Sequence, residues 1–408
     1  MTRATLQRFT LLGTLYFAQG LPFGFFVQAL PVLLRKAGYS LSAIGLATLL
    51  TAPWALKFLW APYVDAHYSA RFGRRRTWIL AMQLAGTIVL AGIALAPGSE
   101  SLAVLMAAMV VLNFIAATQD IATDGLAVEV LPPDERGVAN GLQVAGYRVG
   151  MIVGGGVLLG LYDVLGHHGL FAVMAALTAA SSVPVLLARE PTTISTIAGA
   201  DAPSLPHWLR LPGAARVLAL VVVYKFGEAA AQGMLKPFLV DHGLGLADIA
   251  KISGTIGAAA GMTGALVGGA AVARMGRLRA LVVFGIAQVI SIGGYAYLAL
   301  GTPSYTELCL WAGVEHFASG TATASLFTAM MDWSRPAASG TDYTVQASAV
   351  VIATGVSSML GGVSAQVLGY GAHFGLSALL AAGAVFAVVA WFPRAGFPRG
   401  ASYDAVAK

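Results

Sequence analysis

The chain has 408 residues, of which 58% are hydrophobic and only 10% are charged, and its formal net charge is +6. Soluble domains carry roughly 25% charged residues, so this composition, with a mean hydropathy of +0.77, excludes an ordinary soluble protein. The positive charge does not indicate nucleic-acid binding, because most lysines and arginines fall in segments that we assign to one side of a membrane. Such a bias is typical of a multi-pass membrane protein whose basic loops face the cytoplasm.

Apolar segments of about the length that a bilayer requires recur along the chain. We expect twelve transmembrane helices, at 9–34, 41–63, 77–96, 102–130, 138–162, 170–188, 215–239, 247–273, 279–300, 305–332, 343–366 and 374–392. An even number of helices and a basic N-terminal end place both the N- and C-termini in the cytoplasm. The outer loops are then short, and two of them are expected at 163–169 and 367–373.

A polar stretch rich in proline, serine and threonine separates the sixth predicted helix from the seventh. It covers 189–214 and has the composition of a flexible linker, here on the cytoplasmic side. We therefore expect an all-α protein with an N-terminal six-helix bundle (1–188) and a C-terminal six-helix bundle with a short tail (215–408).

Short patterns recur between the two halves at one constant spacing. The pattern R-x-G-R-x-R begins at Arg71 and again at Arg274. Further pairs at the same spacing are Glu129 and Asp332, Pro133 and Pro336, Gly137 and Gly340, Gln143 and Gln346, and Asn113 and His316. This repetition predicts two parallel six-helix repeats, the architecture of major facilitator transporters, with a solute site near the membrane midplane.

Ionisable side chains lie inside the predicted helices, where they are costly and normally face a bundle interior or a water-filled cavity. Asp120 and Asp124 are four residues apart and share one helix face. Arg148, on the next helix, is expected at the same membrane depth as Asp120. Glu315 and His316 are adjacent, so their side chains are expected to point in different directions.

Other polar groups interrupt apolar helices in the same way. Lys225, Glu228 and Gln232 form one stripe, expected to face the central cavity unless the Lys–Glu pair is purely structural. Lys57 either faces the cavity or extends along the helix to the surface. Residues 19–22 are expected to interrupt the first helix. The predicted cavity residues are Tyr16, Gln19, Lys57, Asn113, Asp120, Asp124, Tyr147, Arg148, Lys225, Glu228, Gln232, Glu315 and His316; those for proton coupling are Asp120, Asp124, Glu228 and Glu315.

A charged loop follows the second predicted helix and reads D-A-H-Y-S-A-R-F-G-R-R-R-T from Asp65. A carboxylate at the C-terminal end of a helix opposes the helix dipole, so Asp65 needs the following arginines or the helix N-terminus near Thr341 as a partner. Such a cluster would act as a cytoplasmic gate, or else its arginines only set the topology. The predicted gate residues are Asp65, Arg71, Arg74, Arg75, Arg76, Glu129, Arg136, Arg274, Arg277, Asp332 and Asp342.

Motifs typical of enzymes and metal sites are missing from the sequence. There is no Walker A segment, no H-E-x-x-H and no G-x-S-x-G. The single cysteine, Cys309, leaves no intramolecular disulfide. We therefore expect no enzymatic activity, no cofactor and no bound metal. The expected partners are a small-molecule solute, protons and the lipid bilayer, without nucleic acid, and the expected state is a monomer.

Several segments resemble the AmpG-like permeases, a branch of the major facilitator superfamily. They are Y-F-A-Q-G-L-P-F-G at 16–24, L-K-F-L-W-A-P-Y-V-D at 56–65, F-G-R-R-R-T-W at 72–78, and A-T-Q-D-I-A-T-D with L-P-P-D-E-R-G at 117–137. In the second half, the segments at 315–332 and 340–348 look more like the RhtX/FptX siderophore importers, which have twelve helices. The resemblance implies that the matched Lys57, Asp120, Asp124 and Arg148 are functional.

These features together predict a secondary transporter of the bacterial inner membrane that couples import of a bulky polar solute to protons by alternating access. A ferri-siderophore is the first candidate solute, and an anhydro-muropeptide is the alternative. Lys57, Arg148 and Lys225 would offer cations to either solute, since both are partly anionic. A membrane receptor or subunit that transports nothing, and a membrane-embedded enzyme, are the alternatives from other classes.

Overall fold

The computed structural model describes residues 2–30, 51–99, 101–188 and 203–392. Within these residues the chain is helical and contains no strand. Eight of the described helices are long and apolar enough to cross a membrane, as expected of a multi-pass membrane protein. The predicted helix at 41–63 lies partly outside the described residues. The count of twelve helices and the cytoplasmic position of the termini therefore stay predictions.

The helices group into two compact units, and each unit takes a short segment from the other half of the sequence. Unit 1 comprises Met1–Leu131, Gly146–Leu205 and Arg335–Val345. Unit 2 comprises Pro132–Ala145, Pro206–Ser334 and Gln346–Lys408. Two helices therefore begin in one unit and end in the other: α8 (Arg136–Ile152) and α18 (Ser339–Trp391).

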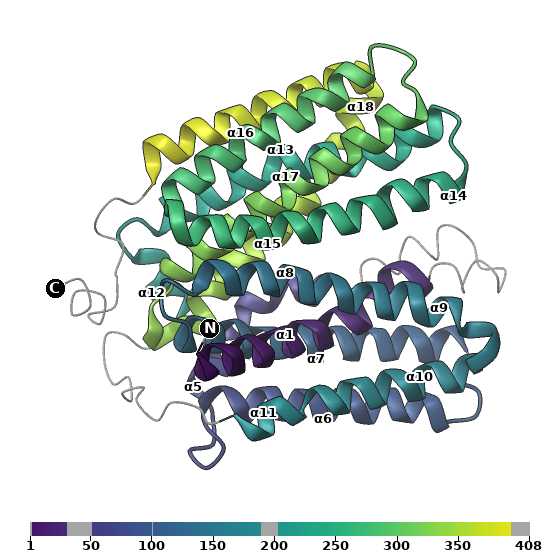
Figure 1. The fold of residues 1–408 in the computed structure, drawn as a ribbon. Coiled ribbons are helices and arrows are strands. Elements are labelled where there is room, and N and C mark those ends of the chain that lie inside the picture. Colours follow the sequence, from purple (N-terminus) through teal and green to yellow (C-terminus); the bar gives the residue numbers. More distant parts are fainter. Residues whose placement is uncertain (1, 31–50, 100, 189–202, 393–408) are drawn as a thin grey trace. The chain divides into compact units, whose positions relative to one another are not determined.

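Unit 1 is built around α6, which packs against both α7 and α10 (Figure 1). Its apolar core includes Phe25, Leu90, Leu112 and Phe171. Apart from its part of α8 and the start of α18, the helices of unit 1 are α1 (Arg3–Gly24), η1 (Phe25–Ala29), α4 (Ala52–Leu56), η3 (Lys57–Leu59), α5 (Ala61–Ala66), α6 (Arg74–Leu95), α7 (Leu102–Val130), η4 (Val153–Val157), α9 (Leu158–Gly160), α10 (Tyr162–Ser181), α11 (Val183–Leu187) and η6 (Pro336–Ala338).

Unit 2 is built around α17, which packs against α15 and α16 (Figure 1). Its helices, besides its parts of α8 and α18, are α12 (Leu205–Arg210), α13 (Ala214–Asp241), α14 (Leu246–Ile249), η5 (Ala250–Ile256), α15 (Gly257–Met275), α16 (Arg277–Leu298) and α17 (Tyr305–Asp332). The helices α13 and α17 are 28 residues long but are not among the eight apolar ones, because charged and polar side chains interrupt their apolar sequence.

Helix boundaries repeat at the same spacing as the sequence patterns. The helices α6 and α16 each have 22 residues and each follow a glycine with positive φ, Gly73 (99°) and Gly276 (80°). Such a φ is open to glycine at little cost. The helix starts Arg136 of α8 and Ser339 of α18 are separated by this spacing too. The internal repeat predicted from the sequence is thus visible in the local structure of the two halves.

Two predicted outer loops are reduced to breaks at single glycines. The backbone is helical on both sides of Gly166 in α10 and of Gly369 in α18, whose φ values are 65° and 77°. The helices thus break inside both expected loops, 163–169 and 367–373, but each break is shorter than predicted, because one glycine with positive φ is enough to redirect the chain. Gly166 and Gly369 are a further pair at the repeat spacing.

Two other sequence expectations also need correction. The first helix is not interrupted at 19–22: α1 continues through Pro22, and the distortion appears afterwards as the π-helical turn η1. A proline removes one backbone donor, and a wider turn is one way for a helix to accommodate it. The predicted flexible linker 189–214 lies partly outside the described residues, but its end forms α12, whose Trp208 is fully buried.

Glycines allow α1 to pack against the second part of α8 and η4 at backbone distance. A Cβ added at Gly154 would lie 1.9 Å from the carbonyl oxygen of Leu21, and one at Gly20 would lie 2.1 Å from that of Tyr147. Small residues at helix interfaces are the common device for close packing in membranes. The close approach of these two helices therefore depends on glycine at both positions.

We predict that Gly154→Ala lowers the unfolding free energy by about 1–3 kcal/mol, since overpacking costs this much in a well-packed core. Gly156→Ala is the matched control, because a Cβ there meets nothing within 4 Å. Both residues lie in η4. Unfolding by SDS in mixed micelles measures the difference, and equal stability of the two variants would contradict the packing account.

Candidate functional site

A break in the helix after residue 56 positions Lys57. The helix α4 ends at Leu56, η3 forms a single 3₁₀ turn, and α5 begins at Ala61. Pro53 and Pro62 occupy the first turns of α4 and α5, where a missing N–H is tolerated. This break leaves Lys57 only 2% exposed.

Lys57 is shared by two aspartates of α7. Its ammonium forms an ion pair with Asp120 and lies 3.9 Å from Asp124 Oδ2. The hydroxyl of Tyr16 donates to Asp124 Oδ1 at 2.8 Å. All four side chains are buried. If all three charged groups are ionised, this Lys57 cluster carries one negative charge in excess, which is costly away from water.

Three aromatic rings and the side-chain amide of Asn113 lie beside the Lys57 cluster. The Lys57 ammonium is 5.5 Å from the centroid of the Trp54 ring, a favourable cation–π arrangement. The Trp54 indole N–H donates to Asn113 Oδ1 at 3.0 Å. The Trp54 ring also packs near Phe23 and Tyr147, with centroid distances of 5.7 Å and 6.5 Å.

Unit 2 contains a second lysine with two carboxylates, on α13 and α17. The Lys225 ammonium pairs with Glu228 and also donates to Thr323 Oγ1 at 3.1 Å. Gln232 Nε2 donates to Glu315 Oε1 at 3.0 Å and lies 3.4 Å from Glu228 Oε1. This Lys225 cluster joins the predicted stripe on α13 to Glu315, which is 1% exposed.

One expectation about these groups was wrong. Glu315 and His316 were expected to point apart, but His316 Nδ1 lies 3.1 Å from Glu315 Oε2. The long glutamate side chain reaches sideways, while the same ring nitrogen also contacts the carbonyl of Ala312 at 2.8 Å. Lys57 and Lys225 each pair with a carboxylate, and their expected role of offering cations to a solute stays a prediction.

Three other predicted cavity residues lie in unit 1. Gln19 is 2% exposed, and neither polar atom of its amide has a hydrogen-bond partner among the described residues. Tyr147 and Arg148 are half-buried on α8. The ion pair of Asp120 is with Lys57, and the match in depth between Asp120 and Arg148 stays a prediction.

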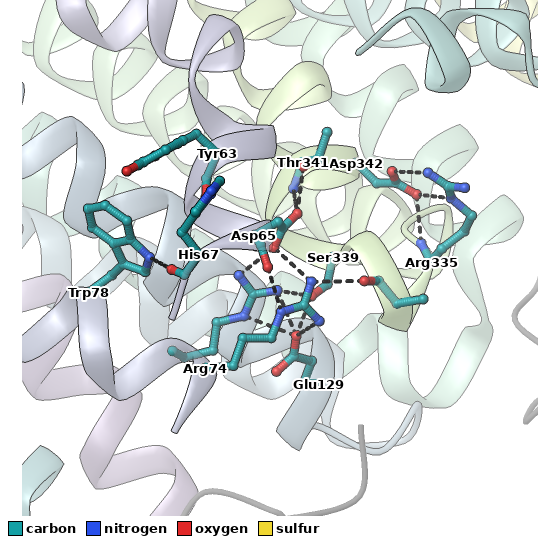
Figure 2. Close-up of polar contacts among 12 residues, drawn as sticks. Tyr63, Asp65, His67, Arg74, Trp78, Glu129, Arg335, Ser339, Thr341 and Asp342 are labelled. Carbon is teal, nitrogen blue, oxygen red and sulfur yellow. Dashed lines mark hydrogen bonds and ion pairs between the residues drawn. The ribbon is translucent and has the colours of Figure 1, made fainter. Parts of the chain in front are cut away.

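Four of the predicted gate residues come together in unit 1: Asp65, Arg74, Arg75 and Glu129. Figure 2 labels Asp65, Arg74 and Glu129 of this group. Asp65 Oδ1 lies 2.6 Å from Arg75 Nη1 and 3.2 Å from Arg74 Nη2. Glu129 Oε1 lies 2.7 Å from Arg75 Nη2. Asp65 and Arg75 are completely buried. The pairing expected between Asp65 and the arginines that follow it is confirmed, and we call this group the Asp65 cluster.

The start of α18 completes the Asp65 cluster (Figure 2). The backbone N–H and the hydroxyl of Thr341 both donate to Asp65 Oδ2 at 2.6 Å. Ser339 Oγ donates to Glu129 Oε1 at 2.7 Å, and Arg74 Nη2 donates to the carbonyl of Ala337 at 2.8 Å. The predicted pairing of Asp65 with the helix N-terminus near Thr341 is therefore confirmed. The free N–H groups at a helix N-terminus favour an anion such as this carboxylate.

The pKa of Asp65 is lowered although the group is buried. Burial alone would raise this pKa, but Arg75, Arg74 and the hydrogen bonds from Thr341 more than offset it by favouring the charged carboxylate. The contribution of Asp65 to stability is therefore present above its unfolded pKa of about 3.9 and is lost as the pH falls through the folded value.

A related cluster in unit 2 uses the equivalent positions of the repeat. Asp332 lies 2.6 Å from Arg277 Nε and 2.7 Å from Arg136 Nη1. Arg277 Nη2 donates to the carbonyl of Pro133 at 2.6 Å. At the repeat spacing, Arg277 matches Arg74 and Asp332 matches Glu129. We call Arg136, Arg277 and Asp332 the Asp332 cluster.

The remaining gate candidates lie outside these two clusters. Arg71 is exposed over the ring of Phe72, Arg76 donates to the carbonyl of Leu186 at 3.2 Å, and Arg274 is exposed at the end of α15. Asp342 pairs with Arg335, with Oδ2 2.8 Å from Nε.

Sequence reasoning missed several partners in these clusters. Ser339 could have been found from its match to Arg136 at the repeat spacing. Ser319 lies one helical turn after Glu315, and its hydroxyl donates to Glu228. Trp54 and Thr323 carry no charge, and no pattern distinguished them. Among the described residues, no group of three or more His, Cys, Asp or Glu is arranged to hold a metal ion.

Comparisons with known proteins agree with a transporter. The family model described as "Acetyl-coenzyme A transporter 1" matches residues 8–164. The anhydromuropeptide permease of Escherichia coli strain K12 is 34% identical over 344 residues, covering 82% of this chain and 70% of the relative.

Solved structures show the same fold at low identity. The human organic anion transporter MFSD10 has a TM-score of 0.75 at 16% identity, covering 95% of this chain and 100% of that chain. A bacterial homologue of the iron transporter ferroportin in an outward-facing state has a TM-score of 0.73 at 18% identity, covering 96% of this chain and 100% of that chain.

We predict that Asp65→Asn lowers the unfolding free energy by about 3 kcal/mol at pH 7, because it leaves buried arginines short of one carboxylate. The difference between wild type and variant should shrink as the pH falls below about 4, where Asp65 of the wild type is protonated in the unfolded state. SDS unfolding at several pH values measures it. A difference that is unchanged down to pH 3 would contradict the ion-pair account.

Proposed function

We propose that this chain, which belongs to the AmpG-like permeases of the major facilitator superfamily, imports anhydro-muropeptides with protons across the bacterial inner membrane. Membership of this family makes the protein a multi-pass membrane transporter. The solute, the coupling ion, the direction and the membrane are the proposed parts. The observation that carries proton coupling is the Lys57 cluster, a buried group with one carboxylate more than it has cations.

The choice of solute follows the similarity to the Escherichia coli anhydromuropeptide permease. A muropeptide joins neutral, hydroxyl-rich amino sugars to an acidic peptide, so it needs both polar and charge-compensating groups. The comparisons lend no support to the RhtX/FptX resemblance or to a ferri-siderophore. We therefore propose the muropeptide as the solute, and the uptake experiment below includes the siderophore as a competitor. A receptor or subunit that transports nothing is less favoured, because the relative is a permease.

Proton coupling follows from the charge of the buried clusters. With Lys57 paired to Asp120, the described residues give the Asp124 carboxylate a hydrogen bond from the Tyr16 hydroxyl and a lysine 3.9 Å away. Moving an uncompensated charge through the low-dielectric part of the membrane costs several kcal/mol. Binding one proton removes this charge, so the protonated cluster is the form able to change conformation. We assign the coupling proton to Asp124, with Glu228 and Glu315 of the Lys225 cluster as the equivalent pair in unit 2.

The Asp65 and Asp332 clusters supply a cytoplasmic gate in this proposal. Each ties the start of a helix from one half of the sequence to helices of the other half, through Thr341 in one case and Arg136 in the other. These bonds must break for solute to leave toward the cytoplasm and re-form afterwards. Hydrogen bonds to charged groups are worth about 1.5–3 kcal/mol, a cost that solute and proton binding can offset.

Uptake into membrane vesicles tests the solute and the coupling together. We predict that vesicles containing the protein accumulate labelled anhydro-muropeptide when an inward proton gradient is imposed, and that they accumulate little without it. Unlabelled muropeptide should compete, and ferri-siderophore should not. Accumulation that is independent of the gradient would contradict proton coupling, and competition by the siderophore alone would contradict the solute.

The variant Asp124→Asn separates transport from coupling. It leaves Lys57 paired with Asp120 and should abolish gradient-driven accumulation. It should retain exchange of labelled for unlabelled solute, which needs no net proton movement. Asp163→Asn is the matched control, since Asp163 is exposed on α10. Normal accumulation by Asp124→Asn would remove Asp124 from the coupling role.

A further inference from the structure

We propose that one face of α1, with two neighbouring aromatic side chains, forms the subsite of unit 1 that binds the sugar part of the solute. This inference rests on the proposed function and goes further, because it assigns one chemical part of the solute to named residues. The residues are Tyr16, Gln19, Phe23, Trp54 and Tyr147.

The face of α1 connects the Lys57 cluster to the aromatic rings. Tyr16, Gln19, Gly20 and Phe23 recur at i, i+3, i+4 and i+7, which places them in one row on a helix. Tyr16 at one end of the row donates to Asp124. Phe23 at the other end packs against the rings of Trp54 and Tyr147. Gln19 therefore lies between a charged group and an aromatic group.

The side-chain amide of Gln19 is buried without a partner among the described residues, at both Nε2 and Oε1. A buried amide that makes no hydrogen bond costs about 1–3 kcal/mol, and native structures rarely keep one without a reason. An amide offers both donors and an acceptor. It complements the acetamido group or a hydroxyl pair of an amino sugar, which also presents a donor beside an acceptor.

The aromatic rings next to Gln19 provide an apolar surface for a sugar ring. The centroids of Phe23 and Tyr147 are 5.7 Å apart, with planes inclined by 47°. Both side chains are only half-buried, whereas Trp54 is buried and its ring is flanked by Lys57. The face of an aromatic ring is electronegative, so it attracts the weakly positive C–H groups that line one face of a pyranose. Phe23 and Tyr147 are thus the rings that we assign to the sugar.

Charge decides which part of the solute this subsite accepts. The only lysine of the Lys57 cluster is already paired with a carboxylate, and a second carboxylate remains. Placing an acidic peptide here would bring like charges together in a low-dielectric environment, which is strongly unfavourable. The neutral sugar avoids this repulsion, so the sugar occupies the α1 subsite and the peptide lies elsewhere.

Binding to the full-length protein in lipid nanodiscs tests the assignment. The probes are the anhydro-muropeptide, its anhydro-disaccharide without peptide, and the free peptide. We predict that Gln19→Leu and Tyr147→Leu each weaken binding of the muropeptide and the disaccharide about tenfold, equivalent to roughly 1.4 kcal/mol, and leave peptide binding unchanged. Phe114→Leu is the aromatic control, because Phe114 stacks on Trp60 at 5.0 Å, outside the subsite.

Thermal stability distinguishes binding from folding in these variants. Replacing an unpartnered buried amide by an apolar group of similar size is neutral or stabilising, so Gln19→Leu should not lower the unfolding temperature while it weakens binding. Tyr147→Leu, on a different helix, gives a second independent variant. Wild-type affinity for the disaccharide in both variants would overturn the subsite. Failure of the wild type to bind either sugar-containing probe would instead overturn the proposed function.

Discussion

A buried lysine shared by two carboxylates is the interaction on which the account depends. Lys57 has Asp120 and Asp124 in unit 1, while Lys225 has Glu228 and, through Gln232, Glu315 in unit 2. One cation makes it tolerable to keep carboxylates away from water, and the second carboxylate leaves each cluster ready to take a proton. The break at η3 and the polar row of α13 are the local structures that place the two lysines.

The two gate clusters share the repeat but are unequal. At the repeat spacing, the position of Asp65 corresponds to Gly268, where a Cβ would lie 2.5 Å from Thr321 Cα. Close packing of α15 on α17 therefore excludes an aspartate from the second half. The Asp65 and Arg75 side chains are fully buried, whereas the Arg277 and Asp332 side chains are 18% and 19% exposed. We expect the Asp65 cluster to be the stronger of the two.

Structural features that depend on residue spacing or on charge could be predicted from the sequence. The repeat followed from one constant residue spacing between the two halves, and the pairing of Asp65 followed from its charge at a helix end. Side-chain reach could not be predicted: Lys57 was free to bind a solute or a carboxylate, and the choice depends on the distance between α7 and η3. The kink at Gly369 was also missed, because composition does not distinguish a kink from a loop.

Counting the protons taken up on solute binding tests the central claim most directly. Calorimetric titration of the purified protein with anhydro-muropeptide, in buffers of different ionisation enthalpy at one pH, gives this number. The account predicts net uptake of about one proton per solute, because the spare carboxylate of a buried lysine cluster must be neutralised, and predicts that Asp124→Asn lowers the uptake. A binding enthalpy that does not depend on the buffer would contradict the account.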